Sequence, residues 1–346
     1  MKKVAIIGHF AFGKTFLDGQ TVKTKTLTEE LERKFGKEQV LKQDTHGGKK
    51  KLLFLPFMLV QALVKCKNVI ILPAHNGLRI IAPLLFFLNK LFGRKLHYAV
   101  IGGWLPGFLE KRKVLTKVLK GFHCIYVETK AMKKALEEKG FSNILIMPNC
   151  KKLQILKKEE ELVFVESEPF KLCTFSRVMK EKGIEDAIEA VKKVNEAKGR
   201  TVFTLDIYGQ VDGGQAEWFE ELQKNFPEYV RYGGLVPFDQ SVEVLKNYFA
   251  LLFPTRFYTE GIPGTIIDAY AAGVPVISSK WENFDDIVEE NVTGLGYEFL
   301  NVEALNEALL NVAENEDMMN QMKSACIQKA EAFLPENALQ NLYAGM

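Results

Sequence analysis

The sequence predicts two α/β domains, each built on a parallel sheet with crossover helices. The chain has 346 residues, 47% of them hydrophobic and 26% charged, which is enough for two packed domains. Short runs rich in β-branched and aromatic residues alternate with helical patterns along the whole chain. A charged, weakly patterned stretch at residues 151–168 interrupts this alternation, which then begins again, and the stretch therefore indicates a linker.

Each half supplies its own series of elements. The predicted strands of the first half are residues 3–7, 68–72, 97–101, 124–127 and 144–147, and its clearest helical patterns are 21–34 and 130–139. The predicted strands of the second half are residues 172–175, 203–208, 230–232, 251–253 and 276–278, with helices at 185–196, 240–247, 265–272 and 302–313. We therefore expect an N-terminal domain at 1–160, a C-terminal domain at 161–325 and a helical segment at 326–346 that packs back toward the first domain.

The residue types exclude several classes of protein. Five scattered cysteines without Cys-x-x-Cys spacing predict reduced thiols in the cytoplasm and no disulfide framework or zinc site. The five histidines form no i, i+4 pair and no cluster with carboxylates, so no metal is expected. Apolar runs such as 80–88 are far shorter than the roughly 20 residues of a membrane-spanning helix, and the apolar run near Met1 is too short for a signal peptide.

The charge is distributed very unevenly. Residues 1–150 hold 27 Lys/Arg and 10 Asp/Glu, whereas residues 151–346 hold 19 and 33. Residues 45–109 contain no acidic residue and include the apolar runs 52–60 and 80–88. Basic and apolar residues together suggest an anionic membrane surface as a partner, and no nucleic-acid-binding signature accompanies them. Two alternatives to a membrane surface remain. The two halves can simply differ in surface composition, and the apolar runs can be helices buried in the core.

Residues 8–15, GHFAFGKT, match the phosphate-binding pattern G-x-x-x-x-G-K-[ST] directly after a predicted strand. In a P-loop the helix begins at the Gly-Lys-Thr, so that its amides hold phosphate. Here Asp18 and Gly19 follow closely, and the helical pattern begins only near Thr21. No predicted strand supplies the Asp that helps hold magnesium. The pattern therefore favours an ordinary glycine-bearing loop, with a P-loop NTPase kept as an alternative.

Two strand–loop–helix segments in the second half suit a diphosphate better. Arg177 and Lys182 lie on the first loop, where a guanidinium fork and an ammonium group can bind phosphate oxygens. The second segment runs from Pro254 to Asp268 and contains Pro263, which suits a first helical turn, and Gly264, which lets a ligand approach the backbone. The amides at that helix start would face an anion.

Glu260 and Asp268 add two hydrogen-bond acceptors suited to sugar and ribose hydroxyls. The alternative is that they are only a helix cap and a surface acid, with no ligand. With these residues the chain resembles glycosyltransferase family 4, retaining enzymes of the GT-B fold. The family pattern continues as A-x-x-x-G-x-P-V-I, which stands here at 269–277 as AYAAGVPVI. Similar short pieces are MPN at 147–149, YG at 208–209, GGLV at 233–236 and NVTG at 291–294. The resemblance covers nearly the whole chain and is stronger in the C-terminal half.

The resemblance implies the fold class α/β, GT-B, with two Rossmann-like domains whose parallel sheets face each other across a cleft. It implies that Arg177 and Lys182 bind the donor diphosphate, that Glu260 contacts the transferred sugar as a catalytic residue, and that Asp268 holds the ribose. Further donor-side candidates are the helix-start residues, the base-lining residue and the loop residues beside the phosphates: Gly264, Thr265, Ile266, Val236, Gly209, Gly19 and Gln20. Acceptor-side candidates are Asn76, Gly103 and Trp104.

Two positions depart from the family pattern. The second Glu of E-x7-E is Asp268, which is one methylene shorter. Many members also have a His after the strand that corresponds to 97–101, where this chain has Gly102-Gly103-Trp104. Either His75, at the end of a neighbouring strand, acts as a catalytic residue in its place, or no protein base is used and the departing phosphate accepts the proton.

The predicted function is retaining transfer of a hexose from a nucleoside-diphosphate sugar, UDP favoured, to a glycan or lipid-linked acceptor in polysaccharide or glycolipid synthesis. The expected location is cytoplasmic, with peripheral contact to the inner face of the plasma membrane through 45–109. The reaction is expected to use no cofactor and no metal. A catalytically silent nucleotide-sugar-binding protein and the P-loop NTPase are the alternatives.

Overall fold

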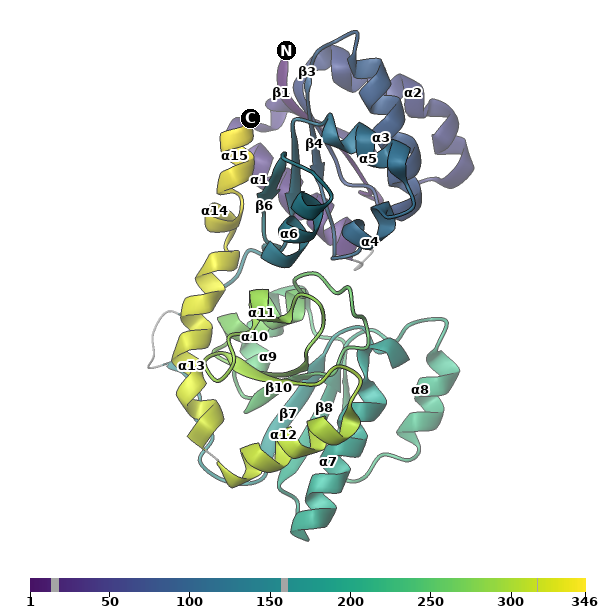
Figure 1. Ribbon diagram of the computed structural model, residues 1–346. Coiled ribbons are helices and arrows are strands. Elements are labelled where there is room, and N and C mark those ends of the chain that lie inside the picture. Colours follow the sequence, from purple (N-terminus) through teal and green to yellow (C-terminus); the bar gives the residue numbers. More distant parts are fainter. Residues whose placement is uncertain (14–18, 157–160, 316) are drawn as a thin grey trace. The chain divides into compact units, whose positions relative to one another are not determined.

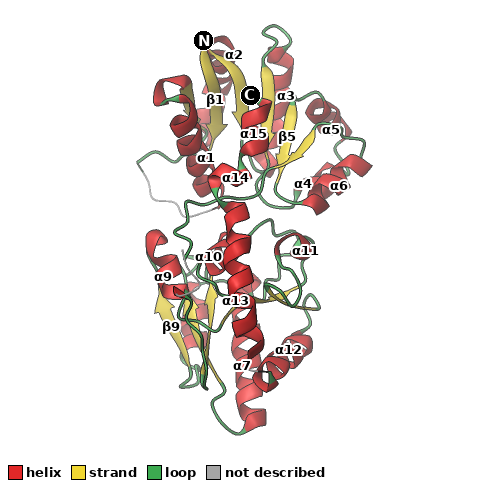
Figure 2. Cartoon of the chain, turned by 90° about the vertical axis from the view of Figure 1, so that its left-hand side faces the viewer, coloured by secondary structure: helices red, strands yellow, loops and turns green. Residues whose placement is uncertain are grey.

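The computed structural model describes residues 1–13, 19–156, 161–315 and 317–346. The chain divides into two compact units, the first formed by Met1–Lys151 with Pro335–Met346 and the second by Lys152–Leu334. Among the described residues, each unit holds one six-stranded sheet in which all strand pairs are parallel. Helices flank both sheets (Figure 1, Figure 2). The predicted pair of parallel α/β sheets is confirmed.

The sheet of the first unit has buried, apolar central strands, as expected where helices cover both faces. Its strands are β1 (Lys2–Gly8), β2 (Val40–Asp44), β3 (Cys66–Ile71), β4 (Lys95–Ala99), β5 (Cys124–Val127) and β6 (Ile144–Ile146), in the order β2-β1-β3-β4-β5-β6. Its helices are α1 (Gly19–Phe35), α2 (Gly48–Lys65), α3 (His75–Asn89), α4 (Leu105–Leu109), α5 (Lys113–Lys120), α6 (Lys130–Glu138), α14 (Pro335–Ala338) and α15 (Gln340–Gly345).

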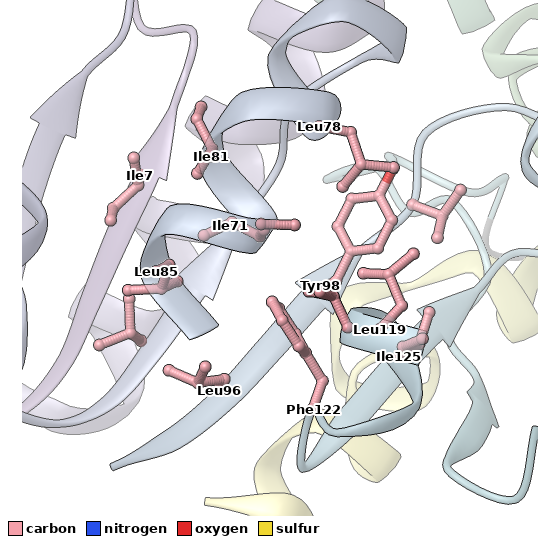
Figure 3. Packing of buried hydrophobic residues seen from close by; sticks show 14 of the residues in the cluster. Ile7, Ile71, Leu78, Ile81, Leu85, Leu96, Tyr98, Leu119, Phe122 and Ile125 are labelled. Carbon is pink, nitrogen blue, oxygen red and sulfur yellow. The ribbon is translucent and has the colours of Figure 1, made fainter. Parts of the chain in front are cut away.

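Helices α2, α3, α5 and α6 pack their apolar sides on one face of this sheet, in a core that also includes Ile7, Ile71 and Tyr98. Figure 3 shows Tyr98 in the middle of this packing, with Leu78 above its ring and Phe122 beside it. Helices α1 and α15 cover the opposite face, so that residues from both ends of the chain share one core. In Figure 1, α2, α3 and α5 lie together on one side of the strands and α1 and α15 on the other.

The second unit repeats the design. Its strands are β7 (Phe170–Phe175), β8 (Phe203–Tyr208), β9 (Val230–Gly234), β10 (Ala250–Phe253), β11 (Val276–Ser279) and β12 (Gly294–Tyr297), in the order β12-β11-β10-β7-β8-β9. Its helices are α7 (Ile184–Lys198), α8 (Ala216–Gln223), α9 (Ser241–Leu245), α10 (Gly264–Ala271), α11 (Phe284–Ile287), α12 (Val302–Glu314) and α13 (Asp317–Ala330). β7, β8 and β10 are neighbours, and the loops after them therefore meet at the carboxyl edge of the sheet.

The predicted strands and helices lie at or within a few residues of observed ones, and the sequence missed two strands, β2 and β12. The predicted C-terminal segment began at residue 326. In the structure, Cys326 is buried in the core of the second unit, and the part assigned to the first unit begins at Pro335. Among the described residues, no helix is both long and apolar enough to cross a membrane.

Lys323 of α13 is fully buried, and its Nζ donates to the backbone oxygen of Tyr248 at 3.3 Å. Burial penalises the ammonium form and lowers the pKa of Lys323 to about 8, although Cys326 opposes the shift. An unfolded chain keeps this proton until about pH 10.4. Because the unfolded state binds more protons between these pH values, the contribution of Lys323 to the free energy of unfolding should increase from pH 8 to pH 10.

We therefore expect Lys323→Met to raise the free energy of unfolding at pH 7 by roughly 1–3 kcal/mol. The gain over the wild type should shrink at pH 10, where the native amine is already neutral. Urea unfolding at both pH values measures it. Lys329→Met on the same helix, whose lysine pairs with Glu289 at the surface, is the control. A gain of equal size at both pH values would contradict the account.

Candidate functional site

The loop after β7 carries the two predicted phosphate-binding cations. Its backbone continues the sheet pairing, because Val178 N donates to Gln210 O at 2.9 Å and Asp212 N donates to Val178 O at 3.0 Å. A short turn at Lys180–Lys182 then leads through Gly183 into α7. This pairing fixes the loop after β7 against the loop after β8.

Lys182 and Glu260, which are far apart in the sequence, form an ion pair in the structure. Lys182 Nζ lies 2.8 Å from Glu260 Oε2, with the two side chains only 14% and 19% exposed. The ammonium group also lies over the rings of Phe253 and Phe257, at 5.4 and 5.1 Å from their centroids. Two residues to which the resemblance gives separate roles at the donor site are therefore in direct contact.

The loop that carries Glu260 is fixed from two further sides. Thr255 Oγ1 donates to Glu260 Oε2 at 3.1 Å, and Asn283 Nδ2 donates to the backbone oxygen of Glu260 at 2.7 Å. Arg256, on the same loop, forms a bidentate pair with Asp186 in the first turn of α7. Since Lys182 precedes α7, these contacts fix both partners of the ion pair relative to each other.

Arg177 lies outside this ion pair. Its guanidinium is half-exposed, and its Nη1 lies 3.6 Å from Asp212 Oδ2, a distance too long for a hydrogen bond. Such a loosely held guanidinium can exchange its carboxylate partner for an incoming anion at little cost. The sequence pattern predicts a role for Arg177 and gives no signal for Asp212.

The start of α10 offers backbone and side-chain donors. The amides of Ile266 and Ile267 both donate to Pro263 O, at 3.1 and 3.3 Å. Within the described part of the chain, the amides of Gly264 and Thr265 have no acceptor, and the buried Oγ1 of Thr265 has no hydrogen-bond partner. These donors lie at the positive end of the helix, where an anion is favoured.

The remaining predicted donor-side residues are placed as follows. Asp268 is on the buried side of α10 and is 4% exposed. Gly209 has a φ of +133° and accepts a hydrogen bond from Tyr232 Oη at 2.7 Å. A Cβ there would lie 1.9 Å from the backbone oxygen of Ser176, so glycine lets this loop reach the Arg177 loop. Val236 is half-buried, just past β9.

Gly183 is required for the approach of the two loops. Its φ is +69°, and a Cβ would lie 2.0 Å from the backbone oxygen of Pro254. Gly183→Ala should therefore displace the Lys182 loop and strongly weaken binding of a diphosphate ligand. Gly199→Ala is the matched control, because Gly199 at the other end of α7 also has a positive φ of +64° but has open space around its Cβ position. Calorimetric titration with UDP measures both, and equal affinities would contradict this role for Gly183.

The first unit brings a second set of predicted residues together. His75, in the first turn of α3, stacks on Trp104 with ring centroids 3.9 Å apart and contacts the edge of Phe108. Burial and the positive charge of Arg112 lower the pKa of His75, which favours a neutral ring. Trp104 Nε1 donates to Ile101 O at 2.7 Å, which fixes the indole.

The other predicted residues of the first unit are near the same sheet edge. Gly103 is buried beside Trp104, and Asn76 is exposed on α3. Gly19 is the first residue of α1, and Gln20 donates to Leu72 O at 3.1 Å. Asp18, which precedes them in the sequence, lies outside the described residues.

The backbone amides in the segment with the P-loop pattern donate hydrogen bonds to a carboxylate of the protein itself. The amides of Phe10, Ala11 and Phe12 donate to the carboxylate of Asp44 at 2.9–3.3 Å. Burial alone would raise the pKa of Asp44, but these donors and the amide of His46 lower it below its usual range. The structure describes helix α1 from Gly19 onward, whereas Lys14 and Thr15 of the motif lie outside the described residues. The described donors of this loop are therefore not available to phosphate, which disfavours the NTPase alternative.

Comparison with known proteins assigns most of the second unit to a known protein family. A family model described as "Glycosyl transferases group 1" matches residues 157–329, half of the chain. The amylovoran biosynthesis glycosyltransferase AmsK of Erwinia amylovora is 25% identical over 153 residues, 43% of this chain and 37% of that protein. The chain spans about half or less of the length of the curated relatives it matches.

Solved structures show the same fold. Anabaena HepE in complex with UDP-glucose has a TM-score of 0.74 at 14% identity, covering 99% of both chains. Sucrose-phosphate synthase from Thermosynechococcus elongatus has a TM-score of 0.74 at 16% identity, covering 99% of this chain and 98% of that one. The expected GT-B class, with its two parallel sheets, is confirmed. Among the described residues, no group of His, Cys, Asp or Glu has the geometry of a metal site.

Proposed function

The chain belongs to the group 1 glycosyltransferases, and we propose that it is a family 4 enzyme that transfers a hexose with retention of the anomeric configuration. The proposed donor is a UDP-sugar, and the proposed acceptor is a glycan or a lipid-linked glycan. The observation that carries the proposal is the pairing of Lys182 with Glu260 beside the start of α10.

The arrangement suits a nucleoside diphosphate for electrostatic reasons. A diphosphate needs positive charge and directed donors, and the second unit offers Lys182, the half-exposed Arg177 and the donors of Gly264 and Thr265. These groups neutralise the charge of the leaving diphosphate, and the proposal therefore includes no metal and no cofactor. Asp268 is proposed to hold the ribose and Val236 to line the base, and Gly209, Gly19 and Gln20 are proposed to contact the phosphates.

Glu260 is the proposed contact to the transferred sugar. Its carboxylate is held in one orientation by Lys182 and Thr255, so that it can stabilise positive charge that develops on the sugar as the bond to phosphate breaks. We propose that the departing phosphate oxygen takes the proton of the acceptor hydroxyl. His75, neutral and stacked on Trp104, is the alternative base, with Asn76 and Gly103 nearby on the acceptor side.

The choice of UDP and of a polysaccharide or glycolipid pathway is supported by the relatives. The structure of HepE was solved in complex with UDP-glucose, and that of S. aureus TarM in complex with UDP and α-GlcNAc-glycerol. AmsK is described as a glycosyltransferase of amylovoran biosynthesis. We further propose a cytoplasmic protein that contacts an anionic membrane through residues 45–109, whose helices expose Leu53, Phe57 and Phe87.

A donor screen tests the function. Thermal unfolding is measured with UDP-, GDP-, ADP- and dTDP-sugars and with ATP and GTP, because a ligand that binds the native state raises the melting temperature. We expect a UDP-sugar to stabilise the protein most. The transferred sugar's anomeric configuration is then read by NMR from the product, and inversion would contradict retention. Stabilisation by ATP or GTP alone would contradict the donor assignment, whereas binding without any turnover would favour the silent binding protein.

A further inference from the structure

The first unit has a basic hollow between α4, α5 and the end of α6. Its volume is about 450 Å³, within the size range of small-ligand sites. Its wall carries four lysines and one acid, Lys113, Lys117, Lys120, Lys139 and Glu110, and we name it the lysine hollow. Nothing in the proposed transfer reaction uses these residues.

The positive charge in the lysine hollow is poorly balanced. Glu110 Oε1 lies 3.8 Å from Lys139 Nζ, a long ion pair. Among the described residues, Lys113, Lys117 and Lys120 have no acidic side chain within 4 Å. Lys120 Nζ is instead held near Gly140 and over the ring of Phe141, at 5.3 Å. An anion entering the hollow would therefore meet several ammonium groups that lack a close carboxylate partner.

The local sequence of α5 is unfavourable without such an anion. Lys113, Lys117 and Lys120 recur at i, i+4 and i+7 and share one side of the helix, where like charges repel. Lys113 is also the first residue of α5, and no acidic residue offsets the positive end of the helix there. A bound anion would relieve both effects at once.

The surroundings of the lysine hollow indicate what kind of molecule carries the anion. α5 and α6 lie in the same helical layer as α2 and α3, on one face of the sheet, and Figure 1 shows α2, α3 and α5 together there. This layer exposes large apolar side chains, among them Leu53, Phe54 and Phe57 of α2, Phe87 of α3 and Val114 of α5.

The positive charge of this helical layer also favours an anionic membrane. Glu110 is the only acidic residue between Asp44 and Glu128. Lys90 Nζ lies over the ring of the exposed Phe87, at 5.2 Å, so that a basic group and an aromatic ring are neighbours on this surface. Exposed aliphatic and aromatic side chains among lysines are typical of proteins that lie on an anionic bilayer.

We propose that the lysine hollow binds the phosphate of an anionic phospholipid headgroup, while the exposed side chains of α2 and α3 enter the outer part of the bilayer. This inference rests on the membrane contact proposed above and assigns it a defined site. It is independent of donor binding in the second unit.

Flotation with vesicles tests the site. The full chain is mixed at low salt with vesicles of phosphatidylcholine alone or with phosphatidylglycerol, and we expect it to float only with the latter. Each lysine near an anionic surface contributes about 1 kcal/mol, so Lys113→Gln/Lys117→Gln should weaken vesicle binding by roughly 25-fold. Both side chains are exposed, and the melting temperature should be unchanged.

The matched control is Lys34→Gln/Lys37→Gln, which removes the same charge from exposed positions of the same unit, near the end of α1 on the other face of the sheet. It should float like the wild type. Equal losses in both variants, or no loss in either, would overturn the lysine hollow as the site. Failure of the wild type to float would overturn the membrane contact as well, and UDP binding in solution would still report on the donor site separately.

Discussion

Replacing Lys182 with methionine should weaken donor binding by about 10- to 100-fold, with the loss appearing mainly in KM for the nucleotide sugar. A charge-assisted hydrogen bond contributes about 1.5–3 kcal/mol, and 1.4 kcal/mol is a factor of ten. Methionine retains the apolar stem that packs near Phe253 and Phe257 but carries no charge. Steady-state kinetics with varied donor measures the effect.

The control for this variant is Lys180→Met, two residues earlier in the same turn. Lys180 Nζ lies over the Trp218 ring at 5.7 Å and has no contact with Glu260, so the change in net charge is identical while the ion pair is kept. We expect near-normal kinetics. Equal losses in the two variants would show that general charge, and not the position of Lys182, determines donor binding.

Changing Glu260 to glutamine should lower kcat and leave KM for the donor nearly unchanged, the opposite of what we expect for Lys182→Met. The amide oxygen can still accept from Lys182 and Thr255, so the loop should keep its position. The variant loses the negative charge that we propose to stabilise the reacting sugar. Because removing one group that stabilises the transition state typically lowers kcat of an enzyme by about 100-fold or more, we expect kcat to fall by roughly 100-fold. Donor affinity should be unchanged or higher, because Lys182 is no longer neutralised by a carboxylate.

Glu282→Gln is the control for this second variant. Glu282 lies in the loop next to Asn283, and its backbone amide donates to Tyr258 O at 3.0 Å, but the residue is exposed overall and forms no ion pair with Lys182. Its kinetics should match the wild type. A normal kcat in Glu260→Gln, or a loss confined to donor affinity, would remove Glu260 from the chemistry.

The sequence predicted the strands that are buried on both sides and missed two at the sheet edges. The inner strands β5 and β10 read CIYV and ALLF, continuous apolar runs, because neighbouring strands and helices surround them. β2 and β12 have one strand neighbour each and weaker signals. β12 reads GLGY, in which Gly294 is required by a close approach, since a Cβ there would lie 2.2 Å from Val276 O. Strand propensity therefore could not identify it.

The site could be predicted in part. Residue type and loop position make Arg177, Lys182 and Glu260 candidates, because cations and a helix start suit a diphosphate wherever strands end. Thr255 and Asn283 were missed, since their role depends on side chains that meet Glu260 only after folding. The same holds for Asp44, whose bonds to the Phe10–Phe12 amides fill the loop that resembles a P-loop. A short motif does not show whether its donors are already occupied.

The central claim is that the cations after β7 hold the donor's diphosphate, and calorimetric titration with UDP tests it most directly. The wild type is compared with Arg177→Met/Lys182→Met and with the charge-matched Lys180→Met/Lys192→Met, in which Lys192 is an exposed residue of α7. Two charge-assisted bonds of about 1.5–3 kcal/mol each predict a loss of at least 100-fold in the first variant and near wild-type affinity in the second. Wild-type affinity for UDP in Arg177→Met/Lys182→Met would contradict the account.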